Sequence, residues 1–381
     1  MNAINRLTTH LEERNNDLKV LKGEGVKIVG YVPNGYMPEE LVYACGAIPV
    51  GLIRGGEHEP VAASEKHLFP LLDTFCRSQI GYRILGKELI YQLPDLLVVP
   101  ITDRNITAIA DSWQLYTDVP VFKLGVPRYT DTPHALKYYV DGLRSLKQRL
   151  EELTGIEIRD ERLKEEIELS NRIRTLLAKI SLTRKNEHPH ISGSDFIGIN
   201  HATYYADRNF LLQSLESILK KLEIGAATKN NGPRIMLVGS TMAEGDDKVI
   251  KLIEQNNASI VIEEFSEGVR HYRQKVKPNA SPIEALADRY LRRRIPPAFF
   301  HDSIKKRFDY LLGLVEEFKV DGIVWYSLMY RDSYDREGAL FTHLLGENMK
   351  IPLLKLNSDY SAAETAQMRT RIEAFIEILK G

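Results

Sequence analysis

Residues 27–52 read KIVGYVPNGYMPEELVYACGAIPVGL, and this stretch indicates the class of fold. Lys27 to Val32 and Ile48 to Leu52 are short apolar runs rich in β-branched residues, which is typical of buried parallel strands. Pro38 to Cys45 lies between them and begins with proline and two glutamates, as the first turn of a helix often does. The stretch therefore predicts a strand–helix–strand unit, from which parallel sheets are built.

The same alternation continues along the rest of the chain. Further strands are expected at Asp95 to Pro100, Val119 to Val126, Arg234 to Gly239, Ser259 to Phe265, Gly322 to Met329 and Ile351 to Asn357. Helical patterns are expected at His67 to Leu85, through most of His134 to Glu223, and at Ala362 to Leu379. We therefore predict an α/β fold with two Rossmann- or flavodoxin-like parallel-sheet domains joined by a helical layer.

A polar break at residues 229–233, KNNGP, separates the two sets of strands. The expected organisation is an N-terminal α/β domain over residues 1–133, a helical connecting region over 134–230 and a C-terminal α/β domain over 231–381. A chain of 381 residues is long enough to build two such cores.

The charge balance excludes several classes of protein. Fifty-one Lys and Arg against 52 Asp and Glu give a net charge of −1, which offers no basic surplus for nucleic acid. No run of about 18 apolar residues occurs, and Met1 to Lys22 is charged throughout, so we expect no membrane span and a cytoplasmic protein. Walker A, dinucleotide-binding, serine-hydrolase and zinc-protease motifs are absent from the sequence.

The two cysteines, Cys45 and Cys76, are too few for a disulfide framework or for a metal site with four thiolates. Cys76 precedes Arg77, and a thiolate beside that cation would have a lowered pKa and be a candidate iron ligand. Inert packing in a core is the alternative for Cys76, and it is favoured more strongly for Cys45 among small apolar neighbours.

Polar side chains at the ends of the expected strands are the candidate binding residues, because ligands collect at the carboxyl ends of parallel strands. Asn34 and Tyr36 follow the first strand, Asp103 follows the third, and Arg331 lies in the polar run after Gly322 to Met329. Plain turns and solvated loop tips are the alternative interpretation of each.

Four blocks in order along the chain carry a resemblance to a known family. They are PEELVYACGAIPV at 38–50, CRSQIG at 76–81, ALADRYL at 285–291, and IPLL at 351–354 with TRIEAF at 370–375. Together they resemble the superfamily of 2-hydroxyacyl-CoA dehydratase subunits, benzoyl-CoA reductase subunits and double-cubane cluster proteins. That resemblance implies a 4Fe–4S cluster held by cysteines.

The chain departs from the family pattern at most cluster positions. Cys76 is kept, but Thr102, Ser266 and Arg331 stand where family members usually carry cysteine. Threonine and serine are poor iron ligands, and arginine has no lone pair for a cation. The cofactor implied by the resemblance is therefore in question for this chain, with Cys76 first and Cys45 second as the remaining thiols.

The resemblance implies low-potential electron chemistry on an acyl-CoA thioester, by a lyase or an oxidoreductase of anaerobic metabolism. It implies a homologous cluster-bearing subunit or a second copy as partner, and an ATP-dependent activator. Residues expected near a shared substrate site are Asn34, Tyr36, Arg77, Ser78, Asp103 and Arg331; no catalytic residue is assigned.

Two alternatives stay open. Besides an enzyme subunit, the chain could be a clusterless scaffold or regulatory paralogue that pairs with a cluster-bearing subunit, or an unrelated two-domain ligand-binding protein that shares only the fold.

Overall fold

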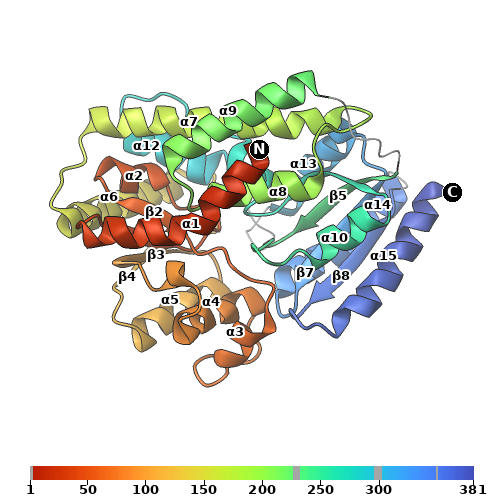
Figure 1. The fold of residues 1–381 in the computed structure, drawn as a ribbon, viewed down its shortest axis with the longest axis horizontal. Helices are drawn as coiled ribbons and strands as arrows, with labels where there is room; N and C mark the ends of the chain where they lie inside the picture. The colour runs from red at the N-terminus through yellow and green to blue at the C-terminus, as the bar shows by residue number, and fades with distance from the viewer. Residues whose placement is uncertain (1–2, 226–231, 296–302, 349–350) are drawn as a thin grey trace.

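A computed structural model describes residues 3–225, 232–295, 303–348 and 351–381. Within them the strands form two four-stranded, all-parallel sheets (Figure 1). The first sheet has the order β2-β1-β3-β4, and the second repeats it as β6-β5-β7-β8. The strands are β1 (Ile28–Tyr31), β2 (Ile48–Gly51), β3 (Leu96–Ile101), β4 (Val121–Gly125), β5 (Arg234–Gly239), β6 (Ser259–Glu264), β7 (Gly322–Leu328) and β8 (Leu353–Ser358). The predicted α/β fold with two parallel sheets is thus confirmed.

Helices account for most of the remaining described residues. They are α1 (Ala3–Gly23), α2 (Glu39–Ala44), α3 (His58–Ala63), α4 (Thr74–Leu85), α5 (Arg104–Tyr116), α6 (Pro133–Thr154), α7 (Asp160–Leu182), α8 (Gly193–Ala202), α9 (Arg208–Ile224), α10 (Lys248–Gln255), α11 (Val269–Tyr272), α12 (Pro282–Ala287), α13 (Ser303–Phe318), α14 (Asp332–Asn348) and α15 (Glu364–Lys380). Short 3-10 turns occur at Leu89–Tyr91 and Thr183–Lys185, and a π turn at Asp288–Arg292.

One expected helix boundary was wrong. The helix expected from His67 begins only at Thr74, because Asp73 caps it by accepting a hydrogen bond from the Cys76 N–H. The charged N-terminal segment, for which no helix was predicted, forms the long helix α1, which packs on α8 and α9.

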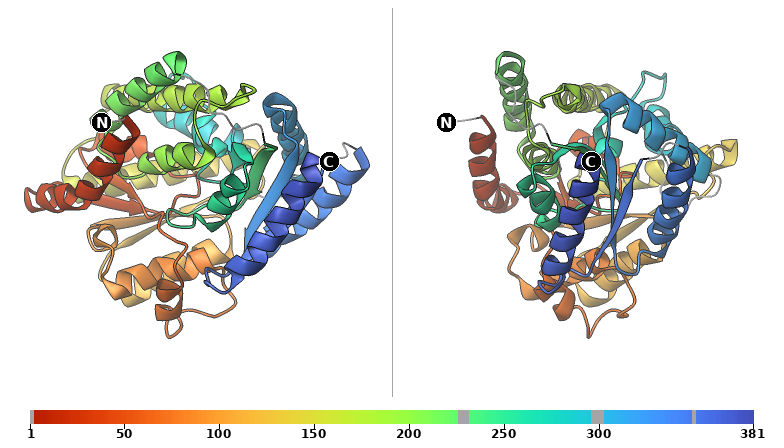
Figure 2. Two further views of the ribbon diagram at one scale, coloured as in Figure 1. Left: turned by 45° about the vertical axis from the view of Figure 1, so that its right-hand side comes forward. Right: turned by 90° about the vertical axis from the view of Figure 1, so that its right-hand side faces the viewer.

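Each sheet is covered by helices on both faces, as expected of buried parallel strands. In the C-terminal unit, α10 and α15 pack on one face of β5–β8 and α13 and α14 on the other (Figure 2). In the N-terminal unit, α4 and α5 cover one face of β1–β4, and α2, α6 and α7 cover the opposite face. The helices from α6 to α9 form the predicted helical stretch between the two sets of strands.

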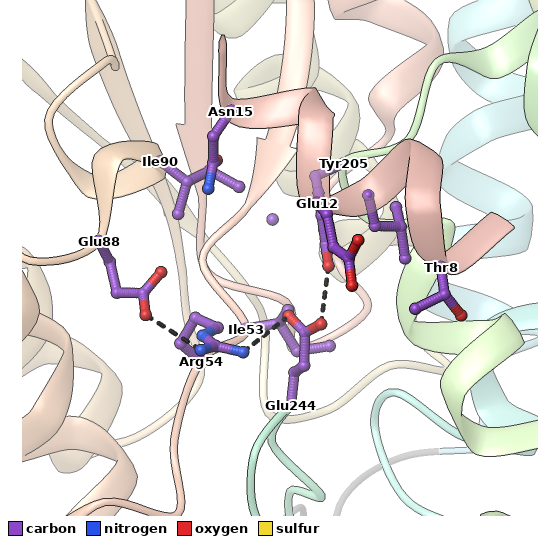
Figure 3. A pocket seen from close by; sticks show the side chains of 11 residues that line it. Thr8, Glu12, Asn15, Ile53, Arg54, Glu88, Ile90, Tyr205 and Glu244 are labelled. Carbon is purple, nitrogen blue, oxygen red and sulfur yellow. Dashed lines mark hydrogen bonds and ion pairs between the residues drawn. The ribbon is translucent and has the colours of Figure 1, made fainter. Parts of the chain in front are cut away.

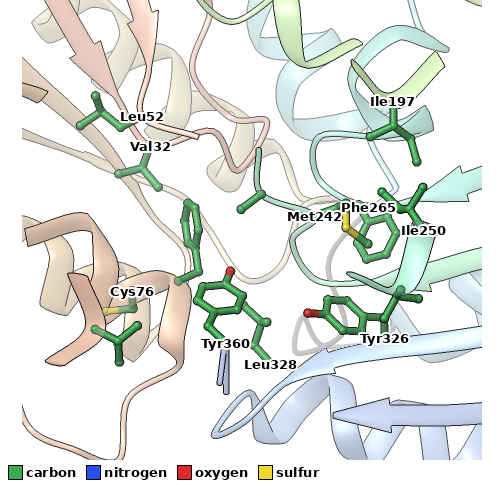
Figure 4. Packing of buried hydrophobic residues seen from close by; sticks show 14 of the residues in the cluster. Val32, Leu52, Cys76, Ile197, Met242, Ile250, Phe265, Tyr326, Leu328 and Tyr360 are labelled. Atoms are coloured by element: carbon green, nitrogen blue, oxygen red, sulfur yellow. The ribbon is translucent and has the colours of Figure 1, made fainter. Parts of the chain in front are cut away.

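One apolar core joins the two α/β units. It runs from Val32, Leu52 and Cys76 in the N-terminal unit to Tyr326 and other side chains of the C-terminal unit (Figure 4). A parallel bridge between Arg54 and Glu244 adds a backbone connection at the same junction. The carboxyl ends of the two sheets are therefore held close to one another. None of the helices in the described ranges is long and apolar enough to cross a bilayer.

Candidate functional site between the two sheets

The strand ends of the two units meet at Arg331. Its Nη1 lies 2.6 Å from Asp73 Oδ2 and 3.2 Å from Asp103 Oδ1, and its Nη2 lies 3.1 Å from Asp103 Oδ2. Asp73 and Asp103 belong to the N-terminal unit and Arg331 to the C-terminal unit, so these ion pairs cross the junction. We call these three side chains the Arg331 clasp. Arg331 is 8% exposed, so its charge is balanced by the two carboxylates rather than by solvent.

Local structure places each member of the clasp. Asp73 and Asp103 are the N-caps of α4 and α5, and each accepts hydrogen bonds from backbone N–H groups of its own helix. Arg331 follows Tyr330, whose φ of 66° lies in the left-handed region that a bulky residue rarely adopts. That turn ends β7 and brings Arg331 to the start of α14. Asn105 Nδ2 donates to Tyr330 O at 3.5 Å across the junction.

Cys76 lies beside the clasp as a buried thiol. Its backbone N–H donates to Asp73 Oδ1 at 2.7 Å, and its Sγ donates to Asn105 O at 2.8 Å. Burial, followed by the negative charge of Asp73, raises the pKa of the Cys76 thiol well above its usual range. Of the two interpretations of Cys76, the structure favours packing in the core over a thiolate activated by Arg77.

Cys45 belongs to a different core. It packs on the sheet face covered by α2, α6 and α7, whereas Cys76 packs on the face covered by α4 and α5. Its Sγ donates to Val42 O at 3.1 Å, and burial raises the pKa of the thiol. The two thiols are thus on opposite faces of the first sheet and are not brought to one site.

The cluster positions implied by the resemblance converge on the clasp. Thr102 Oγ1 donates to Asp103 Oδ2 at 2.8 Å, so Thr102, Asp103, Arg331, Asp73 and Cys76 form one continuous chain of contacts. One protonated thiol, one hydroxyl and one guanidinium do not fit an iron–sulfur cluster, which needs thiolates. Among the described residues, no group of three or more His, Cys, Asp or Glu side chains is arranged to hold a metal ion.

The remaining cluster position after β6 is also occupied by a residue without a thiol. Ser266 is buried, and its backbone N–H donates to Ser240 O at 3.2 Å. Its hydroxyl offers iron no better ligand than Thr102 does.

A basic pocket of about 480 Å³ lies directly outside the clasp, at the ends of β3, β4 and β7. It is lined by Asp103, Arg104, Asn105, Arg128, Ile304, Tyr330, Asp332, Ser333, Arg336, Glu337 and Leu340. Its lining contains three arginines, Arg104, Arg128 and Arg336, and three carboxylates, and the name basic pocket refers to the arginines. Two of the carboxylates, Asp103 and Glu337, are ion-paired with Arg331 and Arg307 behind them.

Two of these arginines are available to a ligand. Arg128 and Arg336 are exposed, and within the described part of the chain they make no ion pair. The pocket also has apolar walls at Ile304 and Leu340.

Asn34 and Tyr36 lie at the junction, but within a packed contact. Asn34 Nδ2 donates to Pro100 O at 2.6 Å, and Arg294 Nη2 of the C-terminal unit donates to Asn34 O at 3.2 Å. The Arg294 guanidinium lies 5.2 Å from the centroid of the Tyr36 ring. Gly35, with φ of 82°, is required here because a Cβ would overlap that guanidinium.

Arg77 and Ser78 lie inside the N-terminal unit. Arg77 Nη2 donates to Val61 O at 3.4 Å and approaches Glu65 at 3.5 Å, while Ser78 Oγ donates to Phe75 O at 2.9 Å. The Arg77 contacts join α4 to α3 and its following turn, and the Ser78 contact lies within α4. Of the six predicted binding residues, the structure brings Asp103 and Arg331 into direct contact, and it joins Asn34 and Tyr36 to Arg294.

The sequence reasoning missed several residues of the site: Asp73, Arg104, Asn105, Arg128, Tyr330 and Arg336. Asp73 had a readable signal, because an aspartate three residues before Cys76 in a helical pattern is a typical N-cap. No sequence signal marked the arginines of the basic pocket, since exposed arginines are common on helices and loops.

A second pocket, of about 290 Å³, lies between α1 and the other side of the junction (Figure 3). Arg54 Nη2 is 3.0 Å from Glu88 Oε1, Arg54 Nη1 is 3.8 Å from Glu244 Oε2, and the Tyr205 hydroxyl donates to Glu244 at 2.7 Å. Because carboxylates already balance Arg54, these contacts join chain segments rather than provide a cation for a bound anion.

Buried carboxyl groups of the C-terminal unit have shifted pKa values. Burial raises the pKa of Glu267 to about 8, and it raises the pKa of Asp246 to about 7. The Tyr326 hydroxyl donates to Asp246 Oδ2 at 2.6 Å, and Glu267 Oε2 accepts from the Met242 N–H at 3.2 Å. Both groups therefore titrate near neutral pH inside the fold.

Curated relatives match almost the whole chain. A putative dehydratase subunit of Escherichia coli is 29% identical, covering 94% of this chain and 93% of that protein. The (R)-phenyllactyl-CoA dehydratase beta subunit of Clostridium sporogenes is 22% identical, covering 95% and 94%. A benzoyl-CoA reductase subunit of Thauera aromatica is 23% identical, covering 93% and 91%.

The family model agrees with these relatives. The model described as 2-hydroxyglutaryl-CoA dehydratase, D-component, matches residues 34–379, which include every strand except β1, the Arg331 clasp and the basic pocket. The chain belongs to the 2-hydroxyglutaryl-CoA dehydratase D-component family, among whose members are dehydratase beta subunits and a benzoyl-CoA reductase subunit.

Proposed function

We propose that this chain is a cytoplasmic subunit of a 2-hydroxyacyl-CoA dehydratase or benzoyl-CoA reductase-type complex, and that its basic pocket takes part of an acyl-CoA thioester. Asp103 and Arg331 form the inner wall in this proposal. Asn34 and Tyr36 shape the junction beside it, and Arg77 and Ser78 support α4 from within.

The observation that carries the proposal is the group of arginines in the basic pocket. Arg104 begins α5, Arg128 follows β4 and Arg336 lies in α14, and the pocket that they line has apolar walls at Ile304 and Leu340. Arginine binds phosphate through paired hydrogen bonds, and apolar walls suit an acyl or pantetheine chain. Coenzyme A thioesters combine phosphates with such a chain.

In this proposal the electron chemistry belongs to a partner. A homologous cluster-bearing subunit would receive single electrons from an ATP-dependent activator, while this chain orients the thioester and excludes water. The second candidate is a clusterless scaffold or regulatory paralogue, which the Arg331 clasp favours because the clasp closes the junction. That role requires the partner subunit but no affinity for the thioester.

The test is calorimetric binding of coenzyme A, dephospho-coenzyme A and pantetheine by the purified chain. Each charge-assisted hydrogen bond to phosphate contributes about 1.5–3 kcal/mol, so the loss of one from each arginine in Arg128→Gln with Arg336→Gln should weaken coenzyme A binding by at least about a hundred-fold. Pantetheine, which lacks the charged nucleotide, should bind both forms equally.

The matched control is Arg162→Gln with Arg172→Gln, which removes the same charge from exposed positions on α7. It should leave the affinity unchanged. If the wild-type chain copurifies with a cysteine-rich homologue but binds none of the three compounds, the scaffold role replaces the acyl-CoA role.

A further inference from the structure

We propose that Arg331 is a built-in cation that takes the place of the iron–sulfur cluster in this chain and fastens the two α/β units together. The inference concerns the chain's own cluster position, and it stands whether or not the basic pocket binds an acyl-CoA.

Positions far apart in sequence converge on the Arg331 clasp. Cys76, Thr102 and Arg331 come from α4, the end of β3 and the end of β7, yet one chain of hydrogen bonds joins them through Asp73 and Asp103. The link runs through the backbone N–H of Cys76, the hydroxyl of Thr102 and the guanidinium of Arg331, so positions from both units lie around the Arg331 clasp.

The buried carboxylates at the junction require a cation. Asp73 is 2% exposed, and Asp103 has 16% of its side chain exposed, so two carboxylates at this junction need a cation. The guanidinium donates from Nη1 to Asp73 and from Nη2 to Asp103. A neutral side chain at position 331 would not balance the charge of these carboxylates. A side chain of the protein itself thus supplies the cation that the two carboxylates require.

Cys76 is the thiol that lies beside the Arg331 clasp. Cys76 Sγ donates its proton to Asn105 O at 2.8 Å and is fully enclosed by the core that spans both units (Figure 4). The thiol is used for packing and hydrogen bonding.

The test is iron and acid-labile sulfide content after anaerobic purification and reconstitution, with a visible spectrum. The wild-type chain should remain colourless and free of iron. The variant Thr102→Cys with Arg331→Cys supplies three thiols with Cys76 and removes the cation, so it should take up about four irons per chain with broad sulfide-to-iron absorption.

The matched control is the same double variant with Cys76→Ser, which keeps two thiols and should lose the cluster. A wild-type chain that holds about four irons per chain, and loses them on Cys76→Ser, would overturn the proposal. A folded double-cysteine variant that stays free of iron would also overturn it, because removing Arg331 would then not have reopened the site.

If the double variant does not fold, the reactivity of the Cys76 thiol tests the proposal without any measurement of iron. The Cys76 thiol should react with an aromatic disulfide reagent many times faster in Arg331→Met than in the wild-type chain, because opening of the two units is then no longer restrained. Equal rates in folded wild-type and variant protein would show that Arg331 does not hold the junction closed.

Discussion

The ends of β3 and β7 are the most informative comparison in the molecule. Both strands hold the third place in sheets of identical order, and both are followed directly by a helix. After β3 the backbone is extended at Asp103, with φ of −159°, and the aspartate caps α5. After β7 the backbone turns left-handed at Tyr330, and Arg331 follows.

The two equivalent strand ends therefore carry opposite charges, and the charges meet. Arg331 binds Asp103 across the junction, and it also binds Asp73 at the start of α4. Two carboxylates or two cations at these ends would repel each other in a buried place. The difference between the two units makes them complementary.

Removing the cation abolishes this complementarity and should cost the most stability. Arg331→Met leaves Asp73 and Asp103 without their buried partner, so we expect a loss of about 3–5 kcal/mol in the free energy of unfolding at pH 7. Urea unfolding followed by circular dichroism measures it.

Arg336→Met is the control for Arg331→Met, because it removes an exposed arginine from α14, the helix that begins beside Arg331. It should cost less than about 0.5 kcal/mol, as surface substitutions usually do. Similar losses for the two variants would mean that the clasp contributes no more than any surface charge.

A second comparison concerns the ends of β2 and β6. Arg54 is the third residue after β2 and is paired with carboxylates, whereas Glu267 is the third residue after β6 and is 1% exposed. The folded pKa of Glu267, about 8, lies above its unfolded value, so the native state binds more protons between these values. The contribution of Glu267 to stability is therefore present at low pH and is lost as the pH rises toward 8.

Glu267→Gln should remove this pH dependence. The stability of the wild type relative to that of the variant should fall by up to about 1.4 kcal/mol per pH unit between pH 5 and 8. Urea unfolding of both proteins at a series of pH values measures the difference in stability. Because both proteins contain Asp246, its titration cancels in that difference. A difference that is constant with pH would show that Glu267 is ionised in the fold throughout.

A smaller change is expected at the turn after β7. Tyr330→Asn places a residue that tolerates the left-handed region at φ of 66°, so the free energy of unfolding should rise by about 1 kcal/mol or less. Tyr129→Asn, at an exposed tyrosine without positive φ, should bring no such gain. A loss of stability at Tyr330 exceeding that at Tyr129 would mean that the side chain, and not the backbone, holds this turn.

Much of the fold follows from local pattern. Apolar runs such as Lys27 to Val32 and Gly322 to Met329 predict the strands, because parallel strands buried on both faces need continuous apolar sequence. The amphipathic pattern predicts the start of α4 too early, since the capping aspartate fixes that boundary at Thr74.

The candidate site follows from the sequence only in part. Strand-end position predicts Asp103 and Arg331 as site residues, but nothing local indicates that they bind each other, and Arg128 and Arg336 carry no local signal at all. Cys45 and Cys76 are both candidate thiols in the sequence, and only the sheet between them shows that they face opposite cores.

Local sequence was thus enough to predict two parallel sheets and the family, and it has Thr102, Ser266 and Arg331 at positions where the resemblance implies cysteine. That Arg331 is an ion-paired cation emerged from the folded structure alone. The reason is physical: Arg331 and Asp103 lie 228 positions apart, and the energy of a buried ion pair depends on how two separately folded units are placed against each other.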